Sequence, residues 1–418
     1  MTLTHDGAMT YAKMSRLVSF FSALLKRKKT IFSDLLHKMA SCQPLYQHLD
    51  TQKILRPQTK PKMEDRDTVS SVHSQSSLIK PSDFDYLKVI GKGSFGKVLL
   101  ARHRQHGGYY AIKVLHKQTI VKRKEQQHVM VERSVLLKGL QHPFLVGLHF
   151  SFQTPNMLYF VVDYVNGGEL FYHLQKEGSF PESRAAFYAA EMTMALGYLH
   201  SLDIVYRDLK PENILLDSKG HVRLTDFGLC KEGVAVGGIM HTFCGTPEYL
   251  APEVLQGHTY SPAVDWWGLG SVLFEMLYGL PPFYSHSKEE MFEKILHAPL
   301  HMRSGVSEAA CSLLEGLLER NVSKRLGERR DIVELQEHPF FASINWDDLL
   351  ARKVTPPFVP NVTSPSDVSY IDPEFTLQPL PTSMTDREWF YGAAVYAEDK
   401  EYSSYESSRG CCHTSQFT

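Results

Sequence analysis

This chain of 418 residues contains several closely spaced glycines and several side chains of the types that bind Mg²⁺. Their spacing suits a site for phosphate groups. Gly91, Gly93 and Gly96 lie within six residues, and a backbone without Cβ atoms can approach phosphates closely and donate its N–H groups to them. Amide and carboxylate oxygens that suit Mg²⁺ follow at Asn213 and Asp226. The pattern predicts a site that holds a magnesium-bound triphosphate.

The stretch 206–213 carries the groups that would act on the triphosphate. Transfer of a phosphoryl group requires that the triphosphate is held, that its charge is neutralised and that the attacking hydroxyl is aligned. Asp208 is placed to accept the proton of the hydroxyl, and Lys210 is placed to contact the γ-phosphate. We therefore predict Asp208, Lys210 and Asn213 as catalytic residues. Asn213 and Asp226 are the predicted metal ligands.

Two ion pairs are expected to hold the site together. Lys113 should pair with the α- and β-phosphates and with Glu132, because the separation of 19 residues fits a strand, a loop and a helix. A lysine that merely extends to solvent is the alternative. Glu253 and Arg325 are expected to form a buried pair that is structural, so its loss should harm folding more than chemistry.

These groups require a β-rich unit that is followed by a helical one. Alternating apolar residues predict strands at 85–90, 98–103, 109–117, 147–153 and 158–163. One amphipathic helix is predicted among them, at about 125–140. Beyond Gly167 the pattern is mostly helical, as at 181–201 and 265–278. The predicted fold class is α+β, with a small β-rich lobe and a larger helical lobe.

Changes of composition divide the chain into four parts. They are a basic N-terminal segment at 1–60, a Ser- and Lys-rich linker at 61–83, a folded domain at 84–341 and a tail at 342–418. Within the domain, we expect the small lobe at 84–162 and the hinge with the large lobe at 163–341. The tail is rich in Pro, Ser and aromatic residues.

The N-terminal segment combines an apolar stretch with a basic end. Residues 1–60 hold ten basic and three acidic side chains, and the apolar stretch 17–25 is followed at once by four basic residues at 26–29. Such a helix can lie in a membrane interface, where anionic lipid contributes about 1 kcal/mol per basic residue. The alternative is a helix that packs on the folded domain, with its basic end in solvent. We expect residues 9–40 to reach a membrane surface.

Composition argues against several classes of protein. Charged residues make up 22% of the chain and the net formal charge is −1, so nucleic acid is not expected as a partner. No apolar run approaches the roughly 20 residues of a spanning helix. The six cysteines show no disulfide or zinc spacing, which indicates a reducing compartment. Reduced thiols are expected at Cys230 and Cys244 rather than a disulfide, and an inert tail at Cys411 and Cys412 rather than a palmitoylation site.

Longer motifs make the sequence similar to a known family. In order and spacing, it resembles the protein kinases at 91–98, 111–113, 206–213, 226–228 and 251–253. It resembles the AGC group of serine/threonine kinases at 206–213, 242–253 and 264–267. It is similar to the serum- and glucocorticoid-regulated kinases at 80–84, 142–152, 167–173 and 344–348. The resemblance covers about residues 80–376 closely and 9–40 more loosely.

The resemblance implies a bilobal protein kinase fold, non-specific serine/threonine protein kinase activity, ATP and Mg²⁺ as cofactors, and a monomer. The adenine should contact backbone groups of Asp163 and Val165 at the hinge, and Val98 should cover it. The implied ATP-binding residues are Ile90, Gly91, Lys92, Gly93, Ser94, Phe95, Gly96, Lys97, Val98, Lys113, Glu132, Asp163, Val165 and Glu169.

Control through Thr242 is a second implication. Thr242 matches the activation-loop threonine that an upstream kinase phosphorylates in this family, so an upstream activating kinase is an expected partner. A dianionic phosphate there needs cations, and Arg207, His128 and Lys231 are suitably placed by motif. An ordinary loop threonine is the alternative.

Substrate preference is a third implication. Glu169, Glu212 and Glu275 match positions that related kinases use to hold arginines upstream of the acceptor, and carboxylates pair well with guanidinium groups. The expected partners are therefore protein substrates with Arg-x-Arg-x-x-Ser/Thr-like motifs. The resemblance also implies roles in ion transport, stress response and cell survival. The expected location is the cytoplasm, with association to the endoplasmic reticulum or plasma membrane and access to the nucleus.

The tail departs from the family after residue 376. The family usually ends in Phe-x-x-Phe-Ser/Thr-Phe/Tyr, an aromatic motif that docks on the small lobe and is phosphorylated. Here 372–376 matches, but Trp389, Phe390 and Tyr391 follow without the rest of the motif. Either these three residues supply the aromatic anchor without the phosphate switch, or this is a divergent or alternatively spliced end that is disordered. We expect control through this motif to be impaired. Two alternatives stay open, a pseudokinase scaffold, which the intact catalytic set argues against, and a membrane-tethered adaptor acting through 9–40.

Overall fold

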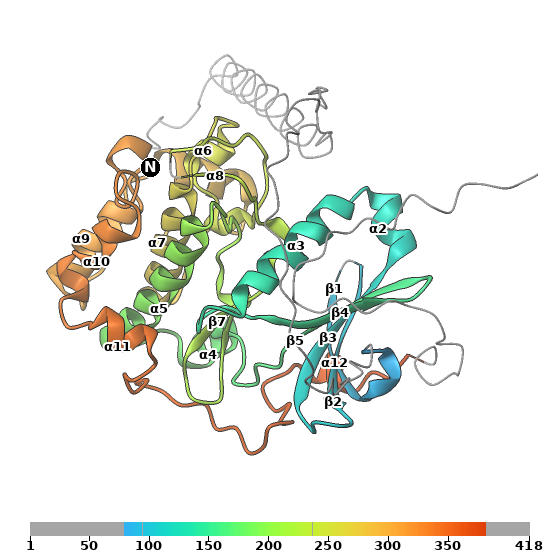
Figure 1. The fold of residues 1–418 in the computed structure, drawn as a ribbon. Helices are drawn as coiled ribbons and strands as arrows, with labels where there is room; N and C mark the ends of the chain where they lie inside the picture. Colours follow the sequence, from blue (N-terminus) through green and yellow to red (C-terminus); the bar gives the residue numbers. More distant parts are fainter. Residues whose placement is uncertain (1–78, 94, 236, 382–418) are drawn as a thin grey trace, which may run out of the picture. The chain divides into compact units, whose positions relative to one another are not determined.

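The computed structural model describes residues 79–93, 95–235 and 237–381. They form a small lobe built on a β-sheet and a larger helical lobe, as the sequence predicts (Figure 1). The N-terminal segment, the predicted linker up to residue 78 and the tail beyond residue 381 lie outside the described residues. Among the helices that are described, none is long and apolar enough to cross a membrane.

Five antiparallel strands make the sheet of the small lobe, in the order β1-β2-β3-β5-β4. They are β1 (Phe84–Gly93), β2 (Gly96–His103), β3 (Tyr109–His116), β4 (Leu148–Gln153) and β5 (Met157–Asp163). Each strand begins and ends within three residues of the predicted stretch. Phe84, Val89, Ile112 and Tyr159 lie in a separate core of this lobe and are almost fully buried.

Two helices follow β3 where the sequence predicts one. They are α2 (Lys117–Arg123) and α3 (Gln126–Gly139). Lys124 separates them, because its backbone is left-handed (φ 59°) and its N–H bonds back to the carbonyls of Ile120 and Val121. α3 lies between the sheet and the large lobe and contacts both (Figure 1). Because α3 contacts both lobes, its position depends on how the two lobes are placed relative to each other.

The large lobe is built around two buried helices, α5 (Glu182–Ser201) and α7 (Ala263–Tyr278). Each lies within two residues of a predicted helix, and Trp266 and Trp267 of α7 are fully buried. Burial of this much apolar surface supplies most of the lobe's stability. The other elements of this lobe are α4 (Leu170–Glu177), β6 (Ile214–Leu216), β7 (Val222–Leu224), α6 (Pro252–Leu255), α8 (Lys288–His297), α9 (Glu308–Leu317), α10 (Ile332–Gln336) and α11 (Trp346–Leu350).

The described part of the tail runs along the hinge to the small lobe. The Tyr164 hydroxyl donates to the carbonyl of Asp367 at 2.6 Å, and Asn166 Nδ2 donates to the carbonyl of Ser364 at 3.2 Å. The short helix α12 (Pro373–Thr376) then packs against β1. The tail thus links the two lobes on the hinge side.

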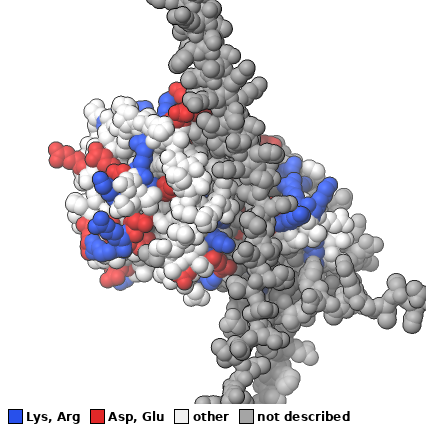
Figure 2. Space-filling model, turned by 90° about the horizontal axis from the view of Figure 1, so that it is seen from above, with Lys and Arg blue, Asp and Glu red and all other residues white. Residues whose placement is uncertain are grey.

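Charged side chains of both signs are mixed over the large lobe. Figure 2 shows Lys and Arg interspersed with Asp and Glu on this lobe in the view from above. Several exposed pairs are in contact, such as Arg330 with Glu337 at 2.6 Å and Lys294 with Glu290 at 3.0 Å. Where charges of opposite sign are interspersed, the field that reaches a distant partner is small.

Candidate active site

The turn between β1 and β2 is where the sequence predicts phosphate binding. Gly91 pairs with Val98, and Gly93 pairs with Gly96 across the turn. A Cβ on Gly96 would lie 1.7 Å from the carbonyl oxygen of Val114, so β2 can run this close to β3 only with glycine there. β1, β2 and their turn carry the predicted residues Ile90, Gly91, Lys92, Gly93, Phe95, Gly96, Lys97 and Val98, while Ser94 lies outside the described residues.

Lys113 on β3 lies next to two carboxylates. Its Nζ forms a hydrogen-bonded ion pair with Oε1 of Glu132 on α3, and it lies 3.9 Å from Oδ1 of Asp226. Burial favours the neutral amine, but these two carboxylates outweigh it and raise the pKa of Lys113. Lys113 also pairs with Val98 across β2 and β3. A permanent positive charge is therefore held close to the phosphate-binding turn.

Asp226 is presented by an uncommon backbone conformation. Its φ is 56°, in the left-handed region that few residues other than glycine adopt. The next residue, Phe227, is fully buried and packs edge-on against Tyr206, with ring centroids 5.8 Å apart. The buried ring fixes the turn, while the Asp226 side chain remains 55% exposed. Its carboxylate is accessible to a cation.

Asp208 lies at the centre of a set of hydrogen bonds. Its Oδ1 accepts from the Thr246 hydroxyl at 2.8 Å, and its Oδ2 lies 2.9 Å from Lys210 Nζ. Asn213 Nδ2 donates to Oδ2 at 3.0 Å and to the Asp208 carbonyl at 2.9 Å. Because the nitrogen of the Asn213 amide is used in this way, its oxygen is the end available to a metal ion. The structure thus brings the three predicted catalytic residues together.

Thr246 is a site residue that the sequence analysis missed. Its hydroxyl accepts from Lys210 Nζ at 2.8 Å while donating to Asp208, so it fixes both groups. Gly245 before it has φ 118°, and a Cβ there would lie 3.0 Å from the Arg207 carbonyl oxygen. A glycine followed by a hydroxyl residue was the available signal, because glycine permits one segment to approach another this closely.

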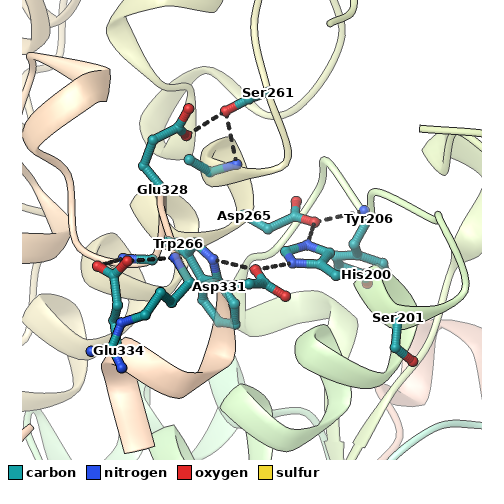
Figure 3. Close-up of polar contacts among 12 residues, drawn as sticks. His200, Ser201, Tyr206, Ser261, Asp265, Trp266, Glu328, Asp331 and Glu334 are labelled. Atoms are coloured by element: carbon teal, nitrogen blue, oxygen red, sulfur yellow. Dashed lines mark hydrogen bonds and ion pairs between the residues drawn. The ribbon is translucent and has the colours of Figure 1, made fainter. Parts of the chain in front are cut away.

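Asp265, near the start of α7, holds the backbone just before Asp208 (Figure 3). Its Oδ2 accepts from the N–H of Tyr206 at 2.8 Å, and its Oδ1 accepts from the N–H of Arg207 at 2.7 Å. Arg207 has φ 70°, which is strained for a side chain with a Cβ. The two hydrogen bonds stabilise this strained turn and thereby set the direction of Asp208.

His200 on α5 lies between two carboxylates of the same network (Figure 3). Its Nε2 is 2.9 Å from Oδ2 of Asp265, and its Nδ1 is 2.8 Å from Oδ1 of Asp331. The Trp266 indole donates to the same oxygen of Asp331 at 2.9 Å. Burial favours the neutral ring, but the two carboxylates raise the pKa of His200 to about 9. At neutral pH the ring is therefore an imidazolium that balances the charge of Asp265.

The expected pair of Glu253 and Arg325 is present and buried. Arg325 Nη1 lies 2.6 Å from Oε1 and Nη2 lies 2.8 Å from Oε2 of Glu253, which is a bidentate contact. Arg325 also donates to the carbonyls of Ala263 and Glu319. The pair thus ties α6 to the start of α7, and it touches none of the catalytic groups.

The three glutamates that are predicted to hold arginines influence one another. Burial and the charge of Glu212 raise the pKa of Glu169. Burial raises the pKa of Glu275 to about 7, helped by Glu212 and Glu248 and only partly offset by the Tyr249 hydroxyl, which donates at 2.6 Å. Oε2 of Glu212 is buried and has no hydrogen-bond partner in the described part of the chain. Clustered carboxylates of this kind are stabilised by a cation.

Thr242 is exposed, and its backbone is linked to one of the three expected cations through a tyrosine hydroxyl. Its carbonyl accepts from the Tyr260 hydroxyl at 2.5 Å, and Arg207 Nη1 donates to the same hydroxyl at 3.3 Å. Within the described ranges, no hydrogen bond or ion pair joins Thr242 to His128 or Lys231. His128 instead pairs with a glutamate on its own helix turn. Arg207 is thus linked to the backbone of Thr242 through the Tyr260 hydroxyl. Contact of His128 and Lys231 with a phosphate on Thr242 stays a prediction.

The hinge residues Asp163 and Val165 lie at and just beyond the end of β5. The Asp163 carboxylate lies 2.7 Å from His149 Nε2, accepts from the N–H of Gly147 at 2.9 Å and pairs with Arg223. These contacts outweigh burial and lower the pKa of Asp163. The side chain is committed to neighbouring segments, so backbone groups are the candidates for contact with adenine.

Fold and site together define a protein kinase. The small lobe carries a glycine-rich turn and the pair of Lys113 with Glu132, and the large lobe carries the cluster around Asp208. Residues 84–341 match the family model of the protein kinase domain. Residues 362–408 match that of the protein kinase C terminal domain, and this match continues past residue 376.

Known kinases are similar over most of the chain. Serine/threonine-protein kinase Sgk1 of Fundulus heteroclitus is 56% identical over 394 residues, which is 92% of this chain and 91% of that protein. Sgk1 of Oryctolagus cuniculus is 55% identical and that of Homo sapiens 54% identical, each over 389 residues and 90% of both chains. The chain belongs to the serum- and glucocorticoid-regulated subfamily of the AGC serine/threonine protein kinases. The predicted family, fold class, enzyme activity and use of ATP and Mg²⁺ are confirmed.

Proposed function

We propose that this kinase phosphorylates serine and threonine in proteins with arginines upstream of the acceptor, and that phosphorylation of Thr242 activates it. The observation that carries the catalytic assignment is the contact of Asp208 with both Lys210 and Thr246. A carboxylate held between an ammonium and a hydroxyl is oriented before substrate arrives, which lowers the cost of reaching the transition state.

Each residue has a separate role in the proposed transfer. Asp208 aligns the substrate hydroxyl and accepts its proton, and Lys210 stabilises the charge that develops on the transferred group. Lys113, oriented by Glu132, holds the α- and β-phosphates. Mg²⁺, when bound, neutralises charge on the triphosphate, and Asn213 and Asp226 are the residues that would hold it, as described above.

The acidic cluster of Glu169, Glu212 and Glu275 supports the preference for arginine. Two of these carboxylates have raised pKa values because they are buried near a third, and one oxygen of Glu212 lacks a partner among the described residues. A guanidinium group placed among these carboxylates would relieve their repulsion, because it is positively charged and can donate two parallel hydrogen bonds to one carboxylate. Substrates with arginines are therefore favoured over neutral ones.

Peptide kinetics test this preference. We expect a serine peptide of the form Arg-x-Arg-x-x-Ser to have a much lower KM than the same peptide with its arginines replaced by alanine. Glu275→Gln should raise the KM of the arginine peptide and leave that of the alanine peptide unchanged. Glu337→Gln, in an exposed pair remote in sequence from the cluster, is the matched control. Equal KM values for the two peptides with the wild-type kinase would refute the preference.

Activation through Thr242 rests on its exposure and on Arg207. The guanidinium group of Arg207 now donates to the carbonyl of Leu229 and to the Tyr260 hydroxyl, which in turn binds the backbone of Thr242. A phosphate on Thr242 would gain charge-assisted hydrogen bonds from this arginine, which also precedes Asp208 in the chain. The phosphate would thus order the segment against the catalytic loop.

Stoichiometric phosphorylation of Thr242 tests the switch. We expect turnover of the arginine peptide to rise strongly after treatment with an upstream kinase, and Thr242→Ala to remain at the basal rate. If Thr242→Ala reached the wild-type rate after the same treatment, the switch would lie elsewhere in the chain.

We further propose that residues 9–40 bring the kinase to a membrane surface from the cytoplasm, at the endoplasmic reticulum or plasma membrane. The support is the apolar stretch 17–25 with its four following basic residues, which lie outside the described residues. Sedimentation of the full chain with anionic vesicles should be lost when residues 26–29 are changed to glutamine, without loss of kinase activity. A full chain that fails to sediment with such vesicles would contradict the proposal.

The remaining predictions rest on the family resemblance alone. They are the monomeric state, access to the nucleus, and roles in ion transport, stress response and cell survival. A pseudokinase scaffold is not favoured by any feature of the site, since Lys113, Asp208 and Asp226 are all in place.

A further inference from the structure

Helix α3 is attached to the activation segment, the stretch that follows Asp226 and carries Thr242, by a three-residue contact that no catalytic role explains. The Ser134 hydroxyl donates to Oε1 of Glu232 at 2.7 Å, and Lys138 Nζ lies 2.6 Å from the same oxygen. Lys138 Nζ also donates to the Ser134 hydroxyl at 3.3 Å. Ser134 and Lys138 are one helical turn apart, so both face the same way. We call this contact the Glu232 bridge.

Glu232 projects from a part of the activation segment that is fixed to the large lobe. Lys231 exchanges two backbone hydrogen bonds with Val205, both of 2.9 Å, and the N–H of Val234 donates to the carbonyl of Asp203 at 2.9 Å. Val205 is fully buried. The backbone on both sides of Glu232 is therefore hydrogen-bonded to the large lobe. The Glu232 side chain thus gives α3 a fixed point of contact.

The C-terminal end of α3 has a second attachment to the large lobe. The hydroxyl of Tyr198 on α5 donates to the Lys138 carbonyl at 3.0 Å, and its ring stacks on His142 at 4.8 Å. Lys138 is thus held by its main chain and by its side chain. Glu132 lies six residues earlier on the same helix, about 9 Å along its axis.

Other contacts attach α3 to the small lobe rather than to the large one. Arg133 Nε donates to the Ser151 hydroxyl on β4 at 3.1 Å, and Glu132 pairs with Lys113 on β3. The Glu232 bridge fixes the helix relative to the activation segment, and a helix attached near one end transmits a small rotation to residues along its length.

We propose that Glu232 is a positioning residue, which sets nucleotide affinity by holding α3 where Glu132 orients Lys113. This inference rests on the kinase activity and not on the proposed arginine preference or on phosphorylation of Thr242. Lys138 and Glu232 are 38% and 31% exposed, so the pair is partly screened by water. Its loss should weaken binding of Mg·ATP about threefold to tenfold rather than abolish it.

Two single variants of the full chain test the bridge. Glu232→Gln keeps the shape of the side chain and removes its charge, and Lys138→Met keeps the length and removes the ammonium. In both, we expect the Kd of Mg·ATP, measured by direct binding, to rise about threefold to tenfold, with the KM of ATP rising in parallel. The KM of the peptide should not change.

A charge exchange separates positioning from packing. The double variant Lys138→Glu with Glu232→Lys restores a pair of opposite charges and should return the Kd of Mg·ATP toward the wild-type value. Asp85→Asn, which breaks an exposed pair with Arg104 elsewhere in the small lobe, is the control and should leave the Kd unchanged.

Two outcomes would overturn the inference. One is an unchanged Kd of Mg·ATP in both single variants. The other is a higher Kd of Mg·ATP that accompanies a lower melting temperature and is not restored in the double variant. That result would mean that the contact contributes only to packing. Because nucleotide binding is measured directly, failure of the arginine peptide as a substrate would refute the substrate proposal and leave this test intact.

Discussion

The catalytic loop and helix α3 are held in place in different ways. The loop around Asp208 depends on buried charges within the large lobe, since His200 is 2% and Asp265 is 1% exposed. α3 is joined to the activation segment by the partly exposed pair of Lys138 with Glu232. Buried charges interact strongly because water does not screen them, and partly exposed ones interact less. We therefore expect the contacts that hold Asp208 to be stronger than the contact between α3 and the activation segment.

The largest effect in this comparison is expected at Asp265. Asp265→Asn removes the charge that balances His200 and places an amide against backbone donors. Breaking a buried pair in this way costs about 3–5 kcal/mol. Thermal and denaturant unfolding should show that loss, together with a fall in kcat that exceeds any change in the Kd of ATP. An unfolding free energy equal to that of the wild type would mean that the loop is not held by this network.

A smaller effect, which depends on pH, is expected at Asp331. The pKa of His200 is raised from 6.5 to about 9, so its contribution to stability is fully present below pH 6.5 and is lost as the pH rises through 9. Asp331→Asn removes one of the two carboxylates and should lower this pKa. The variant should be less stable at pH 6 and lose less stability between about pH 6.5 and 9. The measurement is the unfolding free energy of the wild type and of the variant across this pH range. Equal slopes against pH for the two proteins would contradict the account.

A third effect is expected where substrate meets the acidic cluster. The pKa of Glu275 is raised to about 7, so below this pH the free kinase carries a protonated carboxyl that cannot pair with arginine. The KM of the arginine peptide should rise as the pH falls below 7, by at most roughly tenfold per pH unit for one group. With Glu275→Gln, the KM should be high and this dependence absent. Initial rates from about pH 5.5 to 8 would decide, and an identical profile in the variant would assign the titration to another group.

The smallest effect is expected at Asp85, in an exposed pair with Arg104 whose side chains are 49% and 60% exposed. Asp85→Asn should change the unfolding free energy by less than about 1 kcal/mol and leave the KM of ATP as in the wild type. Comparison with Glu232→Gln sharpens the contrast between a surface pair and a pair between elements. If Asp85→Asn lowered the unfolding free energy more than Glu232→Gln does, burial would not be the factor that sets the strength of these ion pairs.

Much of the fold could be predicted because its signals are local. The alternation of apolar residues defines the strands, and the long apolar patterns define α5 and α7. Helix α2 was not predicted, because its seven residues bury only Ile120 and are too few to show a periodic apolar pattern. The path of the tail past Tyr164 is set by tertiary contacts and could not be predicted either.

The candidate site could be predicted where its residues stand in fixed spacing, as Asp208, Lys210 and Asn213 do. The contact of Thr246 with two of them was missed because it joins segments 36 and 38 residues apart. The pair of His200 with Asp331 spans 131 residues and has no motif of its own. Contacts of this kind follow from packing, which a single sequence does not reveal.

The most direct test of the account is phosphate transfer from ATP to an Arg-x-Arg-x-x-Ser peptide by the full chain, before and after phosphorylation of Thr242. Asp226→Ala, which removes a metal-binding carboxylate, serves as the blank. The account predicts transfer by the wild type that rises strongly with phosphorylation, and none above background in the blank. ATP binding without transfer in the phosphorylated wild type, or undiminished transfer in Asp226→Ala, would contradict it.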